Sequence, residues 1–318
     1  MTMKILRTAL VAGCAAFTLT PAWAQSPAPK AAVSAPAAQR TFASPEAAAK
    51  ALADAVRTVD GKAVLAVVGP ASKSWLFSGD DVADREDWKN FLEAYDRKNA
   101  ITKEGDAKAT LVVGNADWPF PVPLVKKGDK WSFDIVAGRE EVINRRVGRN
   151  ELDTIETLRA IVDAQRIYAS ADPDGNGVAS YATRFISTPG KKDGLYWQTK
   201  AGEPESPLGP LIGEAAGHGY KMNTQPSNPQ PYQGYYYRMI MRQGKSARGG
   251  AYDYRVKGRL FGGFAVVAYP ATYGVSGVKT FIVNHDGVVY EKDLGKATST
   301  VAPALATFDP DKTWQKVQ

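Results

Sequence analysis

Apolar residues recur at helical spacing in three segments that precede residue 100. In the first, Ser44 can cap a helix whose first position is Pro45, and Ala48, Leu52 and Val56 then lie on one face. A second, short segment runs up to Gly69, and a third covers about residues 84–98, with its large apolar side chains on one face. The pattern therefore predicts three helices at the start of the folded chain.

The pattern then changes to strand-like segments. These cover residues 108–113, 120–126 and 130–135, and Gly128-Asp129 joins the last two as a tight turn. Helices followed by a hairpin-rich sheet predict an α+β domain over residues 41–137. The order resembles the nuclear-transport-factor-2-like fold, although Pro119, Pro121 and Pro123 make the middle strand an edge or a loop.

One long helix is expected over residues 138–171, because Ile155, Leu158 and Val162 belong to a continuous apolar stripe opposite a charged face. Antiparallel strands rich in Gly and Tyr follow, at about 234–242, 252–256, 262–269, 279–284 and 288–292. Residues 138–318 thus read as a second domain, formed by a connecting helix and a sheet. The passage from the helix to Tyr181 resembles the helix-to-sheet junction of type IV pilin-like proteins.

The first 24 residues have the pattern of a signal peptide. Lys4 and Arg7 precede a short apolar run, and Ala22-Trp23-Ala24 offers a cleavage site, so we expect a periplasmic or secreted protein that starts at Gln25. The alternative is an outer-envelope lipoprotein anchored through Cys14, because Val11-Ala12-Gly13-Cys14 resembles a lipobox. Residues 25–40 form an Ala/Pro-rich linker, and no transmembrane helix is expected after cleavage.

Composition narrows the chemistry. The 318 residues carry a formal charge of +7, and loss of Lys4 and Arg7 leaves +5, which suits weak attraction to anionic envelope polymers or lipids. Export and the absence of long basic runs argue against nucleic acid as a partner. Cys14 is the only cysteine and there are two histidines, so neither a thiolate nucleophile nor a zinc site is expected in the mature chain.

The turn after the long helix is the candidate metal site. Asp172, Asp174 and Asn176 place oxygen ligands at alternate positions, and Gly177 stands at the sixth, as in the first half of a calcium-binding EF-hand loop. Thr183 stands at the twelfth position, where such loops have a bidentate Glu. A calcium ion here would make the protein a calcium-stabilised structural module. The alternative is an Asx-rich turn that ends the helix and needs no metal.

No pattern identifies a catalytic centre. Ser276 is followed two residues later by Val278, where a nucleophile elbow needs Gly, and His285 lies in a hairpin turn. Two carboxylate pairs would suit a cell-wall or glycan hydrolase if they faced each other across a glycosidic bond. They are Glu140/Glu141 and Glu203/Glu205. The sequence does not show such facing, so whether the protein is an enzyme stays open.

The densest aromatic group is the candidate binding surface. Tyr235 and Tyr236 lie on opposite faces of a predicted strand, and Arg238 and Trp197 add charge and a further aromatic ring. One face of this strand is expected in the core. The other could stack on sugar rings or contact a protein partner.

Several stretches together resemble the bacterial domain-of-unknown-function family 2950 over nearly the whole mature chain. They include residues 117–123 (DWPFPVP), 144–152 (NRRVGRNEL), 193–197 (DGLYW), 205–210 (ESPLGP) and 280–295 (TFIVNHDGVVYEKDLG). The resemblance implies an uncharacterised exported protein and supplies no functional residues. We therefore expect a non-enzymatic binding or assembly module of the cell envelope, which binds an envelope polymer or an envelope protein.

Overall fold

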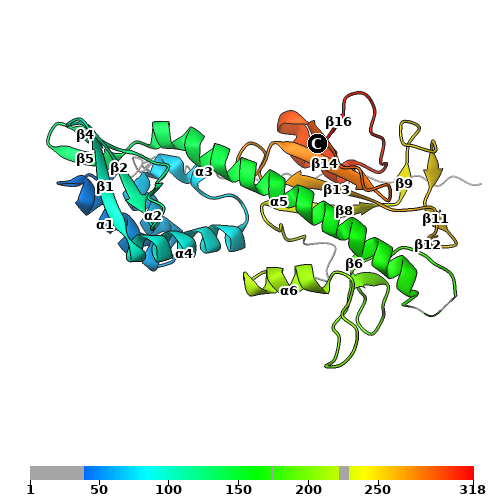
Figure 1. The fold of residues 1–318 in the computed structure, drawn as a ribbon. Coiled ribbons are helices and arrows are strands. Elements are labelled where there is room, and N and C mark those ends of the chain that lie inside the picture. Colours follow the sequence, from blue (N-terminus) through cyan, green and yellow to red (C-terminus); the bar gives the residue numbers. More distant parts are fainter. Residues whose placement is uncertain (1–38, 174, 176, 222–228) are drawn as a thin grey trace, which may run out of the picture. The chain divides into compact units, whose positions relative to one another are not determined.

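The structure, a computed structural model, describes residues 39–173, 175, 177–221 and 229–318, and these form helices and antiparallel sheets (Figure 1). The chain is therefore an α+β protein, as the sequence predicts. The signal peptide, Cys14 and most of the predicted linker lie outside the described residues.

Side-chain caps set the starts of the first helices. Ser44 accepts the backbone N–H of Ala47 at 3.1 Å, and this confirms the predicted start of the first helix. The next long helix begins at Asp81, three residues before its predicted start, because the Asp80 carboxylate accepts the N–H groups of Val82 and Ala83. The helices of this part are α1 (Pro45–Arg57), α2 (Gly61–Val68), η1 (Pro70–Ser72), α3 (Lys73–Leu76) and α4 (Asp81–Arg97).

The first sheet is antiparallel, with strand order β1-β2-β4-β5 and β3 paired to β2. Of the predicted middle strand over residues 120–126, only residues 124–126 lie in a strand, β4, because Pro121 and Pro123 have no N–H to donate to a ladder. Residues 118–119, just before it, form the short strand β3 that pairs with β2. Strand β1 was not predicted, since nearly all its side chains are exposed and it has no apolar alternation. The strands are β1 (Asn99–Glu104), β2 (Lys108–Val113), β3 (Trp118–Pro119), β4 (Leu124–Lys127) and β5 (Lys130–Phe133).

The predicted long helix is confirmed as α5 (Ile135–Ala171). It starts three residues early because Asp134 accepts the N–H groups of Val136 and Ala137, each at 3.1 Å. It ends at Asp172, whose left-handed backbone (φ 45°) turns the chain.

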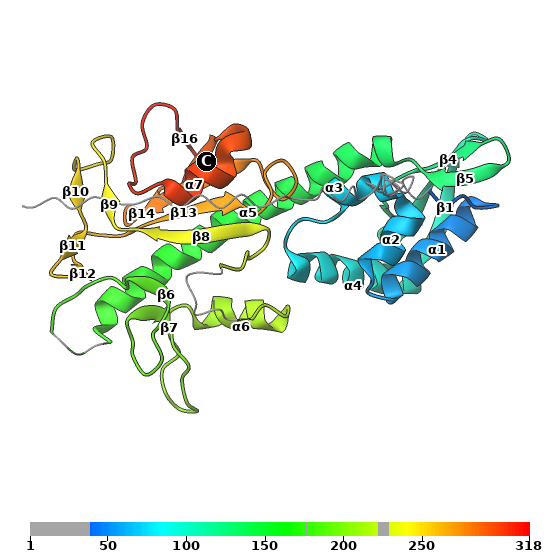
Figure 2. The same ribbon diagram turned by 180° about the vertical axis from the view of Figure 1, so that it is seen from behind.

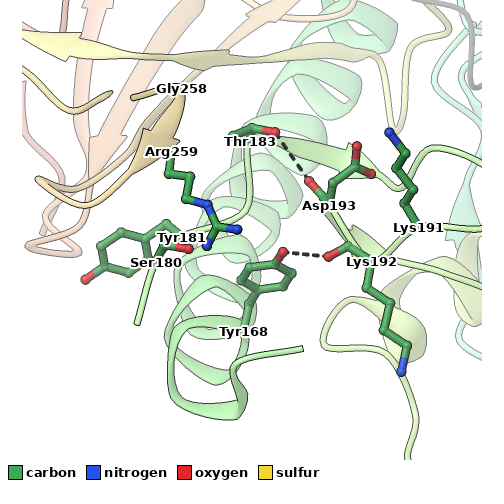
Figure 3. Close-up of a pocket in the computed structure, with 9 residues that line it drawn as sticks. All are labelled: Tyr168, Ser180, Tyr181, Thr183, Lys191, Lys192, Asp193, Gly258 and Arg259. Atoms are coloured by element: carbon green, nitrogen blue, oxygen red, sulfur yellow. Dashed lines mark hydrogen bonds between the residues drawn. The ribbon is translucent and has the colours of Figure 1, made fainter. Parts of the chain in front are cut away.

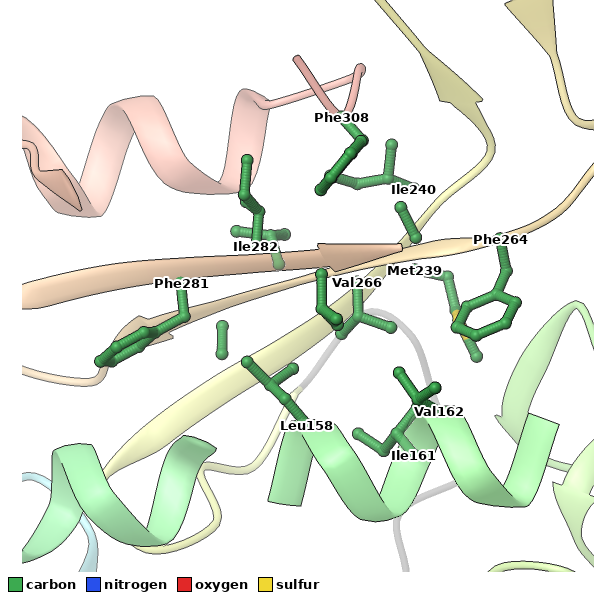
Figure 4. Packing of buried hydrophobic residues seen from close by; sticks show 14 of the residues in the cluster. Leu158, Ile161, Val162, Met239, Ile240, Phe264, Val266, Phe281, Ile282 and Phe308 are labelled. Atoms are coloured by element: carbon green, nitrogen blue, oxygen red, sulfur yellow. The ribbon is translucent and has the colours of Figure 1, made fainter. Parts of the chain in front are cut away.

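The second sheet is also antiparallel, in the order β16-β15-β14-β13-β8. Leu158, Ile161 and Val162 of α5 pack on one face of it (Figure 4). Helix α7 and Phe308 cover the other face, where Ile240 and Ile282 point (Figure 4). The elements are β8 (Tyr235–Ile240), β13 (Ala265–Pro270), β14 (Lys279–Asn284), β15 (Tyr290–Asp293), β16 (Gln315–Lys316) and α7 (Thr298–Ala304), of which α7 and β16 were not predicted.

Shorter elements surround this sheet (Figures 1 and 2). Two strands form a small parallel pair, and four others form two short antiparallel ribbons. The elements are β6 (Arg184–Ile186), β7 (Gly194–Tyr196), α6 (Gly209–Gly217), β9 (Arg242–Gln243), β10 (Tyr252–Asp253), β11 (Arg255–Val256), β12 (Arg259–Leu260) and η2 (Gly295–Ala297). Helix α6 lies in the long connection between β7 and β8.

Buried hydrogen bonds connect the two halves of the described fold. One Asp80 carboxylate oxygen accepts both the Tyr220 hydroxyl and the Gly234 N–H, each at 2.9 Å. Within the second half, the side-chain amide of Asn150 in α5 donates to the Ser276 carbonyl at 2.9 Å. The domain boundary expected near residue 137 stays a prediction.

Candidate binding site

A pocket of about 440 Å³ opens beside the C-terminal end of α5 (Figure 3). Its size lies in the usual range for sites that take a small ligand or one segment of a polymer. Three separate stretches of chain line it, around Tyr168, Ser180 to Asp193, and Gly258 to Arg259. The pocket therefore exists only once the chain has folded.

Buried side chains of α5 hold the pocket's walls. Gln165 is fully buried, and its side-chain amide both donates to the Ala182 carbonyl and accepts the Ala182 N–H, each at 2.9 Å. The Tyr168 hydroxyl donates to the Lys192 carbonyl at 2.5 Å (Figure 3). These bonds fix two loop segments against the helix, so the pocket is built on a rigid element.

The third wall is the hairpin β11–β12. Lys257 (φ 51°) and Gly258 (φ 82°) form its two-residue turn, in which both positions need a left-handed backbone. The Tyr181 N–H donates to the Leu260 carbonyl at 2.9 Å, which places neighbouring Arg259 beside Tyr181 in the pocket wall.

Asp193 is the carboxylate among the described lining residues, and its charge is locally compensated. It accepts the Thr188 N–H at 2.7 Å and the Thr188 hydroxyl at 2.8 Å, and Arg184 approaches it to 3.7 Å. Desolvation raises the pKa of Asp193, but the Thr188 hydrogen bonds and the charge of Arg184 outweigh it and hold that pKa below its ordinary value. Asp193 is thus charged at neutral pH and already bonded.

The remaining charged groups of the pocket are cations. Figure 3 shows Lys191 and Lys192 on one side and the Arg259 side chain on the other. Within the described part of the chain, neither lysine has a carboxylate within 4.0 Å of its ammonium nitrogen. The Lys192 ammonium instead lies 5.3 Å from the centre of the Trp197 ring. The pocket therefore presents positive charge together with hydroxyl groups.

Trp197, predicted as part of a binding surface, lies next to this pocket. Its ring packs edge-on against Tyr168, with ring centres 6.4 Å apart, and its face carries the Lys192 ammonium. These contacts make Trp197 a positioning residue for Lys192 rather than an open stacking platform.

The other three predicted surface residues do not join Trp197. Tyr235 is fully buried on the α5 face of the sheet and donates to the Lys279 carbonyl at 3.0 Å, so it belongs to the core. Tyr236 packs against Tyr269 at 5.5 Å between ring centres. Arg238 is half-buried and donates to backbone carbonyls of Met239 and Leu305. The fold thus removes Tyr235 from the expected surface, and a binding role for Tyr236, Arg238 and Trp197 stays a prediction.

One of the three predicted calcium ligands can be located. The Asp172 carboxylate accepts the Gly177 N–H at 2.6 Å, and its carbonyl accepts the Gly175 N–H at 2.9 Å. Asp174 and Asn176 lie outside the described residues. The calcium site stays a prediction. Melting curves recorded with calcium and with a chelator test it.

The candidate catalytic groups do not converge in the described residues. Ser276 is fully buried and exchanges hydrogen bonds with Thr272, whereas His285 packs edge-on against Tyr254. Glu141 pairs with Arg145 on the exposed side of α5. Glu203, in the loop before α6, accepts the Lys200 N–H.

A buried acid lies elsewhere, between α4 and α5. Asp84 accepts the Ser78 N–H at 3.0 Å, and Arg146 donates to the carbonyls of Trp75 and Leu76. Desolvation raises the pKa of Asp84 to about 6 against the opposing charge of Arg146. A raised carboxyl pKa is typical of catalytic acids, but structural ion pairs share it, and Asp84 does not line the pocket.

Sequence reasoning missed the pocket's main groups. Lys191 and Lys192 form a dibasic pair between Gly190 and Asp193, which resembles an ordinary solvated loop. Their partners Tyr168 and Arg259 are distant in sequence, so no local pattern indicates that they meet.

These features define an α+β protein with a basic pocket at the junction of a long helix and a sheet. The family described as "Protein of unknown function (DUF2950)" matches residues 39–317, and the chain belongs to this family. No curated protein and no solved structure matches the chain. Within the described residues, no helix is long and apolar enough to cross a membrane.

Proposed function

We propose that the protein is an exported, non-enzymatic binding module of the cell envelope, and that its pocket binds an anionic segment of an envelope polymer. The observation that carries this proposal is the group of Lys191, Lys192 and Arg259 around a pocket of about 440 Å³. Export is supported by the signal-peptide pattern of residues 1–24.

The chemistry of the pocket suits an acidic sugar polymer. Cations bind carboxylate or phosphate groups, and Ser180 supplies a further hydroxyl for sugar contacts. The Thr183 hydroxyl donates to the Asp193 carbonyl at 3.3 Å and can still accept a hydrogen bond from a sugar hydroxyl. Because Asp193 is already satisfied by Thr188, it does not compete for the lysines. A polymer also suits a pocket that opens at the end of a helix, because the polymer units on either side of the bound segment can extend out of the pocket.

The carboxyl groups of the pocket support a binding function rather than glycan hydrolysis. Hydrolysis needs two carboxyl groups about 5–10 Å apart across the bond that is cleaved. Among the described lining residues, Asp193 is the carboxyl group, and its lowered pKa is unsuited to a general acid. Release of soluble sugar from wall material, abolished by Asp84→Asn, would instead support the hydrolase alternative.

The fold supports two finer likenesses within this proposal. Helices followed by an antiparallel sheet in residues 45–133 are the order of the nuclear-transport-factor-2-like fold. Helix α5 packed on the second sheet would also suit a pilin-like head, which stays a proposal. Both folds host binding modules, so they agree with the proposal without specifying a ligand.

Sedimentation with isolated envelope material tests the proposal. Protein purified from cells that express the full chain is mixed with wall sacculi, with membrane-free envelope polymers and with buffer alone, and then pelleted. The variant Lys191→Gln/Lys192→Gln is expected to bind at least about tenfold more weakly, because two charge-assisted contacts are lost.

The matched control is Lys126→Gln/Lys127→Gln, which removes two adjacent exposed lysines from β4. It is expected to bind like the wild type. Equal losses of binding in both variants would show that binding depends only on the net charge of the protein. Wild-type binding by the pocket variant would overturn the proposed site.

A further inference from the structure

The positive charge of the chain is concentrated in one surface segment, residues 242–262. This segment contains six cations and a single acid, Asp253, a formal charge of +5 out of +7 for the whole sequence. The cations are Arg242, Lys245, Arg248, Arg255, Lys257 and Arg259. Such a concentration creates a local positive potential that exceeds what the net charge suggests.

At least three of these six cations are exposed and available to a partner. Arg255 pairs with Asp253 at 2.9 Å, and this pair lowers the pKa of Asp253. Lys245, Arg248 and Lys257 are exposed and have no salt bridge within the described part of the chain. The surface therefore carries cations that are not neutralised locally.

Exposed apolar side chains lie among these cations. Val256 is 53% exposed, and Tyr252 and Phe261 are each 37% exposed. Val256 faces Arg259 across the hairpin, so both side chains lie on one face. Phe261 directly follows β12, and its N–H donates to the Tyr254 carbonyl at 3.1 Å. The Tyr252 hydroxyl donates to the neighbouring Gly262 carbonyl at 3.1 Å, which keeps its ring close to Phe261.

The segment is held firmly by the core. The buried Gln243 side chain donates to the carbonyls of Arg248 and Gly250 and accepts the hydroxyl of buried Tyr254. The Asp309 carboxylate accepts the Ser246 N–H at 2.8 Å. Figures 1 and 2 show β9 to β12 together beside the end of α5. The exposed cations and apolar groups are thus presented on a pre-organised surface.

We propose that the surface of residues 242–262 docks the protein on a bilayer that contains anionic phospholipids, with Tyr252, Val256 and Phe261 entering the headgroup region. Cations beside exposed apolar side chains are the combination that interfacial binding requires: the charges attract anionic headgroups, and the apolar groups gain from leaving water. A purely polyanionic partner would make no use of Val256 and Phe261. The pocket, which shares Arg259 with this surface, would then bind its polymer next to the membrane.

Vesicle flotation tests this surface apart from the pocket. Purified protein is floated with phosphatidylcholine vesicles and with vesicles that also contain phosphatidylglycerol, at low and high salt. The wild type is expected to float only with the anionic vesicles, and to keep part of its binding at high salt because of the apolar contacts. The variant Val256→Asp/Phe261→Asp is expected to bind at least about tenfold more weakly.

Leu152→Asp/Val301→Asp is the matched control, because it adds the same charge at two exposed apolar positions outside the segment. It is expected to bind like the wild type, as is the pocket variant Lys191→Gln/Lys192→Gln. Unchanged melting curves establish that each variant is folded.

Three results would overturn the membrane proposal. They are wild-type binding by Val256→Asp/Phe261→Asp, complete loss of wild-type binding at high salt, and binding to soluble dextran sulfate without any binding to vesicles. The last result would reassign the surface to an anionic polymer. Because envelope-polymer sedimentation is measured without lipid, failure here leaves the pocket's proposed function independently testable.

Discussion

Single buried polar side chains hold together segments that are far apart in the sequence. Asp80 is 1% exposed and serves two purposes: it caps α4, and it accepts the Tyr220 hydroxyl and the Gly234 N–H. Gln165 does the same for the pocket wall at Ala182. Because an unpaired buried donor costs more than one hydrogen bond provides, these residues should dominate local stability.

Replacement of Asp80 by Ala tests this role. It leaves the cap of α4 and two distant donors without an acceptor, so the free energy of unfolding should fall by about 2–4 kcal/mol. The control is Asp60→Ala, which removes only the exposed cap of α2 and should cost about 1 kcal/mol. Urea denaturation measures both, and equal losses would show that the distant contacts of Asp80 contribute nothing.

Asp84 should make stability depend on pH in a defined direction. Its pKa is raised to about 6 in the folded protein from 3.8, so the folded state binds this proton more tightly than the unfolded state. The contribution of Asp84 to stability therefore falls as pH rises from about 4 to about 6, by up to about 3 kcal/mol.

The variant Asp84→Asn isolates this effect. The difference in unfolding free energy between the variant and the wild type should change across pH 4–6.5 and be constant above pH 7. A difference that is constant over the whole range would contradict the raised pKa of Asp84.

At the scale of elements, two glycines of α5 differ in how closely their surroundings are packed. Near the start of this helix, Gly138 lies so close to Val122 that an added Cβ would be 2.8 Å from the Val122 backbone. Gly148, further along the same helix, has no atom within 4 Å of its corresponding position. One glycine is therefore required by packing and the other is not.

Alanine substitutions should separate the two glycines. Gly148→Ala is expected to stabilise the protein by up to about 1 kcal/mol, because alanine favours the helix. Gly138→Ala should destabilise it by about 1–3 kcal/mol despite the same helical gain, because the Val122 segment must move. Thermal or urea unfolding distinguishes these signs, and a stabilising Gly138→Ala would show that the contact is loose.

The sequence predicts those elements whose pattern is local. Helix α5 and strands β2 and β14 follow from an apolar stripe or a short apolar run, and their observed bounds match closely. Strand β1 escapes prediction because its register depends on β2 and not on its own exposed side chains. Helix α7 was not predicted either, because Pro303 and the Thr, Ser and Val residues before it have low helix propensity. This helix is stabilised by packing on the sheet.

At the scale of the whole molecule, the candidate pocket could not be predicted from the sequence, because it is assembled from separate stretches. Aromatic density selected Trp197, which the structure places next to the pocket, but also Tyr235, which packing places in the core. A cluster of aromatic residues in the sequence shows only that such residues are close along the chain. Which side chains line the pocket depends instead on how α5 and the 182–193 loop pack together. The basic segment 242–262 is different, since its charge is local and readable from the sequence alone.

The central claim is that envelope polymer occupies the pocket at Lys191 and Lys192, and lysine acetylation measures this occupancy most directly. Protein bound to envelope polymer and free protein are labelled briefly, and the labelled lysines are quantified by mass spectrometry. The account predicts that Lys191 and Lys192 are protected at least about fivefold in the bound protein, while Lys126 and Lys127 are labelled equally in both. Equal labelling of Lys191 and Lys192 in protein that has sedimented with the polymer would contradict it.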